Sequence, residues 1–331
     1  MRQTVFLALQ LFVAAALALA LARWLDLANP YWAAMPVWVV QQAYREDLVL
    51  RAVLRIIGTL AGAALALAVV RLGLPDVLTA LVLALGVGCA AALAYWIGTV
   101  MSYGAFMAGV TLFVVLLPGF SGFSAATGID PVAAAVDRIF CTLIGVACVT
   151  AATFAFTPRR VGQAPMRAME GRARKALLRF AYCCAMTVCA AAAVIAFPRF
   201  DILAGAMTLI VYSMILSSAP DPRPIASLLV PAVLLGVCAS IAYLFLLKSA
   251  GAEERQAAVL LTAGFLLAGA FLRAWPRTAS YGLDANMCFL IVSEVGAWRH
   301  GTAEVTLAGI AVVCAAAAVS VSGRLLPAER R

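Results

Sequence analysis

The chain has 331 residues, of which 65% are apolar and only 12% are charged, with a net charge of +9. A water-soluble core cannot absorb that apolar share, and the charged share is about half of what ordinary soluble domains carry. With a mean hydropathy of +1.04, the composition excludes a soluble enzyme, a disordered chain and a soluble domain on one anchor, and it indicates an all-α polytopic membrane protein.

Apolar runs of about 20 residues, separated by charge pairs and by Pro or Gly clusters, predict twelve transmembrane helices. The expected spans are 4–23, 30–44, 53–73, 77–97, 102–117, 132–156, 178–197, 202–218, 225–247, 257–274, 281–298 and 303–325. The first run follows Arg2 and ends in small residues, as a signal peptide does. Its apolar stretch is long, so we expect it to be the first helix.

Seven cations gather in one short segment in the middle of the chain. They are Arg159, Arg160, Arg167, Arg172, Arg174, Lys175 and Arg179. Because Lys and Arg are enriched in cytoplasmic loops, we expect this segment and both termini to face the cytoplasm. This topology signal accounts for much of the positive charge, and no basic soluble face is evident that would bind nucleic acid.

Six predicted spans lie on each side of the basic segment. We therefore expect a first six-helix half at 1–157, a basic cytoplasmic linker at 158–177, a second half at 178–326 and a short cytoplasmic tail at 327–331. Since six is an even number, the two halves would insert in the same orientation, related by a pseudo-twofold axis along the membrane normal.

Two sequence matches support a tandem duplication. The tripeptide Ser-Tyr-Gly at 102–104 recurs at 280–282, at the entrance to the fifth span of each half. Gly62 in the third span aligns with Gly236 in the ninth. The interface between the halves is then the expected place for a shared pathway.

A finer repeat lies inside the first half, where residues 55–62 and 138–145 share five identical positions of eight. In each copy Arg, Thr and Gly stand at i, i+4 and i+7 and so share one helix face. They are Arg55, Thr59 and Gly62, and Arg138, Thr142 and Gly145. A guanidinium can grip a carboxylate while Gly admits a close neighbour, so this face suits an organic anion. Alternatively, the arginine side chains extend back to the membrane–water interface, and the shared face serves only to pack one helix against another.

The second and eighth spans have the shortest apolar runs, at corresponding places in the two halves. Such segments are a pointer to a transporter's binding site. The second span brings Tyr31, Trp32, Gln41 and Gln42, whose rings and amides suit a flat ligand with polar edges. Alternatively, Tyr31 and Trp32 belong to the belt of aromatic residues that lies at the membrane–water interface. Tyr103 and Tyr281, in the repeated tripeptides, are further candidates for contact with a ring.

Acidic groups inside the spans are few, and each is a candidate for proton coupling because a charge in hydrocarbon is costly. Asp284 and Glu294 stand in the eleventh span on either side of Asn286, a candidate substrate contact, and Asp137 precedes Arg138. For Asp137 the alternative is a local ion pair. Glu294 could instead lie close to the outer surface, because Arg299 and His300 follow it.

Metal and cofactor sites are not expected. The nine cysteines fall within apolar runs, and the chain has one histidine, His300. Zinc and haem therefore lack a set of ligands. No phosphate-binding loop with Lys and no nucleophile elbow is present in the sequence, so we expect neither an enzyme nor an ATP-driven pump.

The sequence Asn-Pro-Tyr-Trp at 29–32, followed by Arg55-x-x-Gly58-Thr59-x-x-Gly62, resembles the fusaric acid resistance family, also called the aromatic acid exporters. It is similar, more distantly, to the six-helix membrane module of plant aluminium-activated malate transporters. The resemblance is strongest over residues 1–160. It implies proton-driven efflux of aromatic carboxylic acids across the bacterial inner membrane, in some members beside a periplasmic adaptor subunit.

Two departures from the family pattern stand out. The large cytoplasmic domain that often separates the membrane halves is replaced here by a short linker, which puts adaptor-dependent assembly in doubt. The second half lacks a clear Arg-x-x-Gly-Thr sequence, which suggests that the halves have taken unequal roles.

The expected function is therefore efflux of small aromatic or other organic carboxylic acids by proton antiport. In this hypothesis Arg55 and Arg138 hold the carboxylate, the tyrosines and Trp32 contact the ring, and Asp284 or Glu294 carries the proton. One alternative is a passive organic-anion channel, and another is a non-transporting scaffold or assembly component. The expected partners are the substrate anion, protons and the lipid bilayer, while a periplasmic adaptor and a homo-oligomer are left open.

Overall fold

The computed structural model describes residues 2–128, 130–160, 172–250 and 254–328, and these residues form helices and no strands. A helix satisfies all its backbone hydrogen bonds internally, as apolar segments in a bilayer must. The α-helices are α1 (Arg2–Trp24), α2 (Tyr31–Val40), α3 (Arg45–Arg71), α4 (Asp76–Ile97), α5 (Ser102–Leu116), α6 (Ser121–Thr127), α7 (Pro131–Thr153), α8 (Arg172–Ala196), α9 (Phe200–Ser218), α10 (Arg223–Ser249), α11 (Glu254–Ala274), α12 (Ala279–Ser293) and α13 (Thr302–Ser322). Single 3₁₀ turns follow α7 and α13, at Phe154–Phe156 and Gly323–Leu325.

Among the described residues, nine helices are long and apolar enough to cross a membrane. They are α1, α3, α4, α7, α8, α9, α10, α11 and α13. A tenth span arises if α5 and α6, which are bent by 64° at a short break, are counted as one. The chain is therefore a multi-pass membrane protein.

The twelve expected spans differ from this result at three places. The expected spans 30–44, 102–117 and 281–298 correspond to α2, α5 and α12, which have 10, 15 and 15 residues. At about 1.5 Å per residue these helices fall short of the roughly 30 Å of a hydrocarbon core. The expected eighth span is not unusually short, because α9 has 19 residues.

The described chain forms two compact units, and each draws helices from both expected halves. The first consists of Met1–Leu48, Phe140–Arg159 and Leu228–Val313, and the second of Val49–Ile139, Arg160–Ser227 and Cys314–Arg331. These units do not coincide with the expected division at 1–157 and 178–326. The helix α8 begins at Arg172, inside the expected linker 158–177. Residues 161–171 of that linker and 329–331 of the tail lie outside the described residues.

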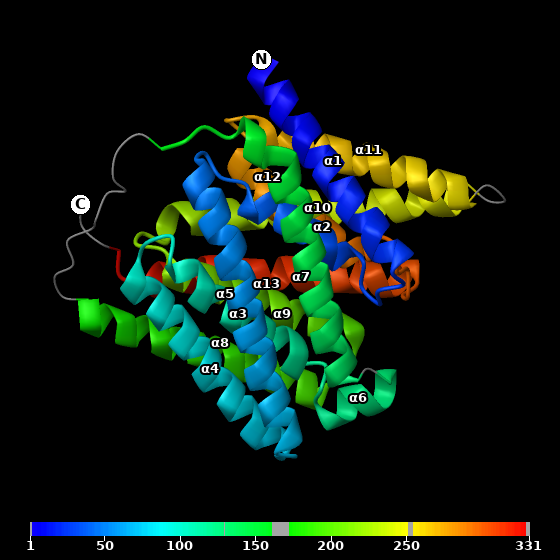
Figure 1. Ribbon diagram of the computed structural model, residues 1–331. Coiled ribbons are helices and arrows are strands. Elements are labelled where there is room, and N and C mark those ends of the chain that lie inside the picture. The colour runs from blue at the N-terminus through cyan, green and yellow to red at the C-terminus, as the bar shows by residue number, and fades with distance from the viewer. Residues whose placement is uncertain (1, 129, 161–171, 251–253, 329–331) are drawn as a thin grey trace. The chain divides into compact units, whose positions relative to one another are not determined.

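In the first unit, α1 packs along α11 and against α2, while α12 packs against both α2 and α11 (Figure 1). The buried face of α1 is rich in alanine, including Ala8, Ala15 and Ala22, and small side chains let helices approach closely. The opposite face exposes larger apolar side chains such as Val13 and Leu17, as expected for contact with lipid.

In the second unit, α4 packs along α8 and against α5, while α9 packs against α8, α4 and α5 (Figure 1). Glycine again marks close approaches. A Cβ on Gly109 of α5 would come within 2.5 Å of the Met214 side chain of α9, and one on Gly88 of α4 would come equally close to Cys184 of α8. The two units thus share a similar pattern of four packed helices.

Three long helices each press a glycine onto the backbone of a short helix. In every case a Cβ on the glycine would collide with a carbonyl oxygen of the short helix. The pairs are Gly62 of α3 on Ala108 of α5, Gly145 of α7 on Ala33 of α2, and Gly236 of α10 on Ala285 of α12. The aligned glycines Gly62 and Gly236 therefore make equivalent contacts.

Arg179, grouped from sequence with the cytoplasmic linker, is instead a fully buried residue of α8. Its guanidinium lies 3.9 Å from the ring centroid of Tyr95. It donates hydrogen bonds to the carbonyl oxygens of Leu216, Ser217, Ala219, Pro220 and Pro327. The last carbonyls of a helix have no partner within the helix, so Arg179 completes the end of α9 and holds the C-terminal segment beside it.

We predict that Arg179→Met lowers the free energy of unfolding by about 3 kcal/mol or more, because a side chain of similar length leaves several buried carbonyls without donors. The measurement is reversible unfolding of the purified protein in mixed micelles. The matched control is Arg199→Met, which removes an exposed ion pair with Asp201 and should change stability by less than about 1 kcal/mol. Equal stabilities of the two variants would contradict the assignment.

Candidate functional site

A buried arginine stands at the contact between α3 and α5 in the second unit. Arg55 is 2% exposed, and its Nη1 donates to the hydroxyl of Tyr103 at 2.5 Å and to Sδ of Met107 at 3.6 Å. Tyr103 and Met107 are one turn apart on α5, so they meet Arg55 from one face. Gly58, one turn along α3 from Arg55, lies against the backbone of Gly104. This close approach brings the Tyr103 hydroxyl within reach.

The charge of Arg55 has no carboxylate within ion-pair distance among the described residues, and its Nε makes no hydrogen bond there. Two buried hydroxyls of the same helix pair also lack a hydrogen-bond partner. They are the Oγ1 atoms of Thr59 and Thr111, and neither has a partner in the described chain. A buried cation is costly unless it is paired. Thr59 stands one turn after Arg55 on α3, and Thr111 lies beside Gly62 of the same helix. The contact between α3 and α5, called here the Arg55 cluster, therefore holds a buried cation and two hydroxyls whose unused hydrogen-bonding capacity suits an anion.

A second cation stands close to the same tyrosine. The guanidinium of Arg51 lies 5.1 Å from the ring centroid of Tyr103. Arg51 is one helical turn before Arg55 on α3, so the two arginines approach the ring and the hydroxyl of one side chain.

The expected ligand contacts of the second span are engaged in local interactions in the first unit. The hydroxyl of Tyr31 donates to Oδ1 of Asn29 at 3.1 Å. Trp32 packs, partly buried, on a cluster that includes Ala18, Ala33 and Cys141. Gln41 and Gln42 each donate to the other's backbone carbonyl, at 3.1 and 2.6 Å. These amides form the turn that ends α2.

Asn286 and Asp284, on α12 in the first unit, both face groups of α11. The amide of Asn286 donates to the carbonyl of Gly269 at 2.9 Å, and that glycine has no Cβ that would block it. Arg273 is the cation that acts on Asp284 electrostatically. Its guanidinium also donates to the carbonyls of Trp38 and Ala279, each at 3.1 Å. Sequence reasoning did not assign Arg273 to a site, because an arginine at the end of an apolar run is typical of an interface.

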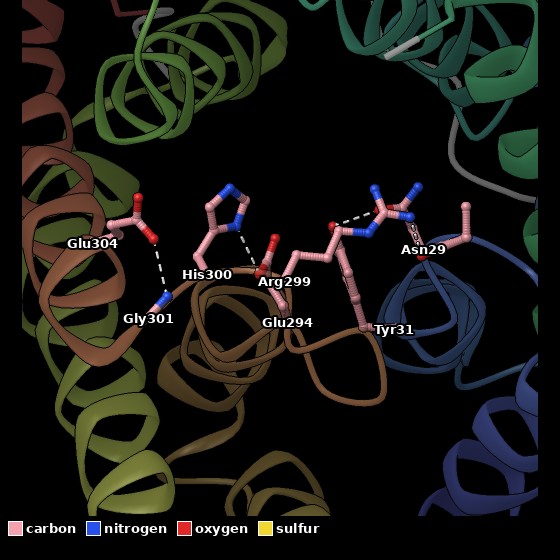
Figure 2. A network of polar contacts seen from close by, with 8 residues as sticks. Asn29, Tyr31, Glu294, Arg299, His300, Gly301 and Glu304 are labelled. Atoms are coloured by element: carbon pink, nitrogen blue, oxygen red, sulfur yellow. Dashed lines mark hydrogen bonds and ion pairs between the residues drawn. The ribbon is translucent and has the colours of Figure 1, made fainter. Parts of the chain in front are cut away.

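Glu294 ends α12 in a left-handed conformation, with φ of 45°. Its side chain is nearly buried, and its Oε2 lies 2.9 Å from Nδ1 of His300. Figure 2 shows this pair within a loop that also holds Arg299, which donates to the carbonyl of Ala28 at 2.9 Å, and Gly301, whose N–H donates to Glu304. The structure thus places Glu294 beside Arg299 and His300.

The fourteen sequence-predicted site residues are divided between the two units. Arg55, Thr59, Tyr103, Asp137 and Arg138 belong to the second unit, and Tyr31, Trp32, Gln41, Gln42, Thr142, Tyr281, Asp284, Asn286 and Glu294 belong to the first. Arg55 and Tyr103 are brought into direct contact. Asp137, Arg138 and Thr142 are buried on α7. Tyr281 is partly buried at the start of α12.

The surroundings of His300, which lies between α12 and α13, raise the pKa of its imidazole. The main cause is the hydrogen bond that the ring donates to the Glu294 carboxylate. Partial burial lowers the pKa, the charges of Glu294 and Glu304 raise it, and the charge of Arg299 lowers it. A raised pKa means that the folded state binds the proton more tightly than the unfolded chain does.

We predict that the pair stabilises the protein fully below the ordinary histidine pKa of about 6.5 and that this contribution is lost as pH rises through the raised pKa. Thermal unfolding of the wild type and of Glu294→Gln should therefore differ most near about pH 5.5 and least near about pH 9. A difference between the two proteins that grows toward alkaline pH would contradict the pairing.

Comparison with known proteins gives one match. The model of the fusaric acid resistance protein family matches residues 4–193, more than half of the chain, and this region contains the Arg55 cluster. No curated protein and no solved structure matches the chain.

Proposed function

Because the chain belongs to the fusaric acid resistance protein family, which implies a role related to membrane transport, we propose that it exports small aromatic or other organic carboxylic acids. In this proposal the protein lies in the bacterial inner membrane and the proton gradient drives export. Both termini lie in the cytoplasm, which requires an even number of spans and therefore α5 with α6 as the tenth span. The observation that carries the proposal is Arg55, a buried cation with no carboxylate partner among the described residues.

The substrate carboxylate would take the place of the missing partner of Arg55. Its two oxygens can accept hydrogen bonds from the guanidinium, where Nε has no acceptor in the described chain, and from the hydroxyls of Thr59 and Thr111. Tyr103 holds the guanidinium through Nη1 and offers an aromatic ring beside it. Met107 contributes an adaptable apolar surface next to the same cation.

The proton would be carried by a carboxyl group of α12. Asp284 has Arg273 as its electrostatic neighbour and Glu294 has His300. An acid at membrane depth is costly to keep ionised, so it can exchange a proton during transport. A periplasmic adaptor and self-association are compatible with this mechanism but are not needed for it.

We predict that Arg55→Gln lowers uptake of a labelled hydroxylated benzoate into proteoliposomes at least tenfold, which corresponds to about 1.4 kcal/mol. Protein-free liposomes correct for passive diffusion of the acid. The control Arg199→Gln, which changes an exposed arginine, should transport normally. The role of Arg55 would be contradicted if the Arg55→Gln variant elutes from a size-exclusion column as a folded, monodisperse species and takes up the acid as fast as the wild type does.

A passive organic-anion channel is the second candidate, because a buried cation that lacks a carboxylate partner among the described residues also suits anion conduction. Coupling of anion transport to the pH gradient distinguishes the exporter from the channel. We predict that Asp284→Asn abolishes accumulation driven by a pH gradient while exchange of labelled for unlabelled acid at equal pH continues. Wild-type current that reverses at the anion's equilibrium potential, whatever the pH gradient, would instead support the channel.

A further inference from the structure

We propose that Arg223 and Arg324 form a binding site for the phosphate group of an anionic phospholipid. The two residues line one pocket of about 330 Å³ in the second unit, together with Ala226 and Ser227. None of these four residues belongs to the site proposed for the substrate carboxylate, so the inference does not depend on which solute the protein transports.

The pocket lies between the start of α10 and the end of α13, two segments that are far apart in the sequence. The hydroxyl of Ser320, on α13, donates to the carbonyl of Ala226 at 2.7 Å in the buried part of this contact. Arg179 joins the neighbouring chain segments, because it donates to the carbonyl of Pro220 before α10 and to that of Pro327 after α13. The pocket is therefore formed by a fixed contact of the fold.

Neither guanidinium in the pocket is used within the fold. Arg223 and Arg324 are exposed, and neither side chain makes a hydrogen bond or an ion pair with another described residue. The carboxylate of Asp221 is engaged with the backbone, since its Oδ1 accepts a hydrogen bond from the N–H of Arg223 at 3.1 Å. Two available guanidinium groups can form parallel hydrogen bonds to the oxygens of one phosphate, a geometry to which arginine is suited.

The lengths of the two helices place the pocket at the level of lipid head groups. α10 is a membrane-length helix that begins at Arg223, and the span that contains α13 ends at Leu325. At about 1.5 Å per residue the 27 residues of α10 extend about 40 Å, beyond the roughly 30 Å of a hydrocarbon core. The ends of such helices lie in the headgroup layer, where basic pockets between helices bind anionic lipids.

Apolar side chains beside the pocket favour a lipid over a free phosphate. Leu325 follows Arg324 directly and is 84% exposed, and Val321, four residues before Leu325, is 66% exposed. An acyl chain can cover such side chains, whereas inorganic phosphate gains nothing from them. The ligand is therefore a lipid whose phosphate binds the two arginines and whose chains lie along the end of α13.

The test is binding of phosphatidylglycerol to the purified full chain in detergent micelles, measured by native mass spectrometry. The pocket variant Arg223→Gln/Arg324→Gln is compared with the control Arg71→Gln/Arg277→Gln, which removes the same charge from two exposed arginines outside the pocket. We expect the Kd of the first bound lipid to rise about tenfold or more in the pocket variant and to stay within about twofold of wild type in the control.

Two competition measurements on the wild type test the proposal whatever the stability of the variants. We expect phosphatidylcholine, whose head group has no net charge, and inorganic phosphate each to displace phosphatidylglycerol about tenfold less effectively than unlabelled phosphatidylglycerol does. Equal displacement by phosphatidylcholine would overturn the preference for an anionic lipid, and equal displacement by inorganic phosphate would show a free-phosphate site. Equal weakening in the pocket and control variants would also overturn the proposal, because the lipid would then respond to net charge alone.

Discussion

The close approach of long helices to the backbone of short ones is the constraint on which the rest of this structure depends. Lipid is as apolar as a leucine side chain, so helices in a bilayer associate through tight contact and polar interactions. Gly58 and Gly62 let α3 lie directly against α5. Without that contact Arg55 could not reach the hydroxyl of Tyr103.

Two buried arginines of the second unit show how different surroundings give one residue type different roles. Arg179 donates to five backbone carbonyls and stacks on Tyr95, so its charge is used within the fold. Arg55 is buried to a similar degree but bonds one hydroxyl and one sulfur. The first arrangement stabilises the end of a helix. The second leaves capacity for a ligand, and this difference is the physical basis for placing the anion at Arg55.

The membrane class and the shared helix face of Arg55, Thr59 and Gly62 could be predicted from the sequence because those features are local. The contact of Arg55 with Tyr103 could not, because the two residues are 48 positions apart. Charge, hydropathy and helical spacing are visible without knowing what lies opposite. The lengths of α2 and α12 were overestimated, because the expected spans run past Gln41 and Glu294, where the backbone leaves the α-helical conformation. The hydrogen bonds of Arg179 were missed, because the carbonyls that it reaches, from Leu216 to Pro327, come beside it only on folding.

Recognition of a carboxylate by Arg55 is tested most directly by equilibrium binding to the purified protein. Calorimetry would compare an aromatic acid with its neutral amide in the wild type and in Arg55→Gln. We expect the wild type to bind the acid at least tenfold more tightly than the amide, a difference of about 1.4 kcal/mol, and we expect this preference to disappear in the variant. A preference for the acid that is equally strong in both proteins would contradict recognition of the carboxylate by Arg55.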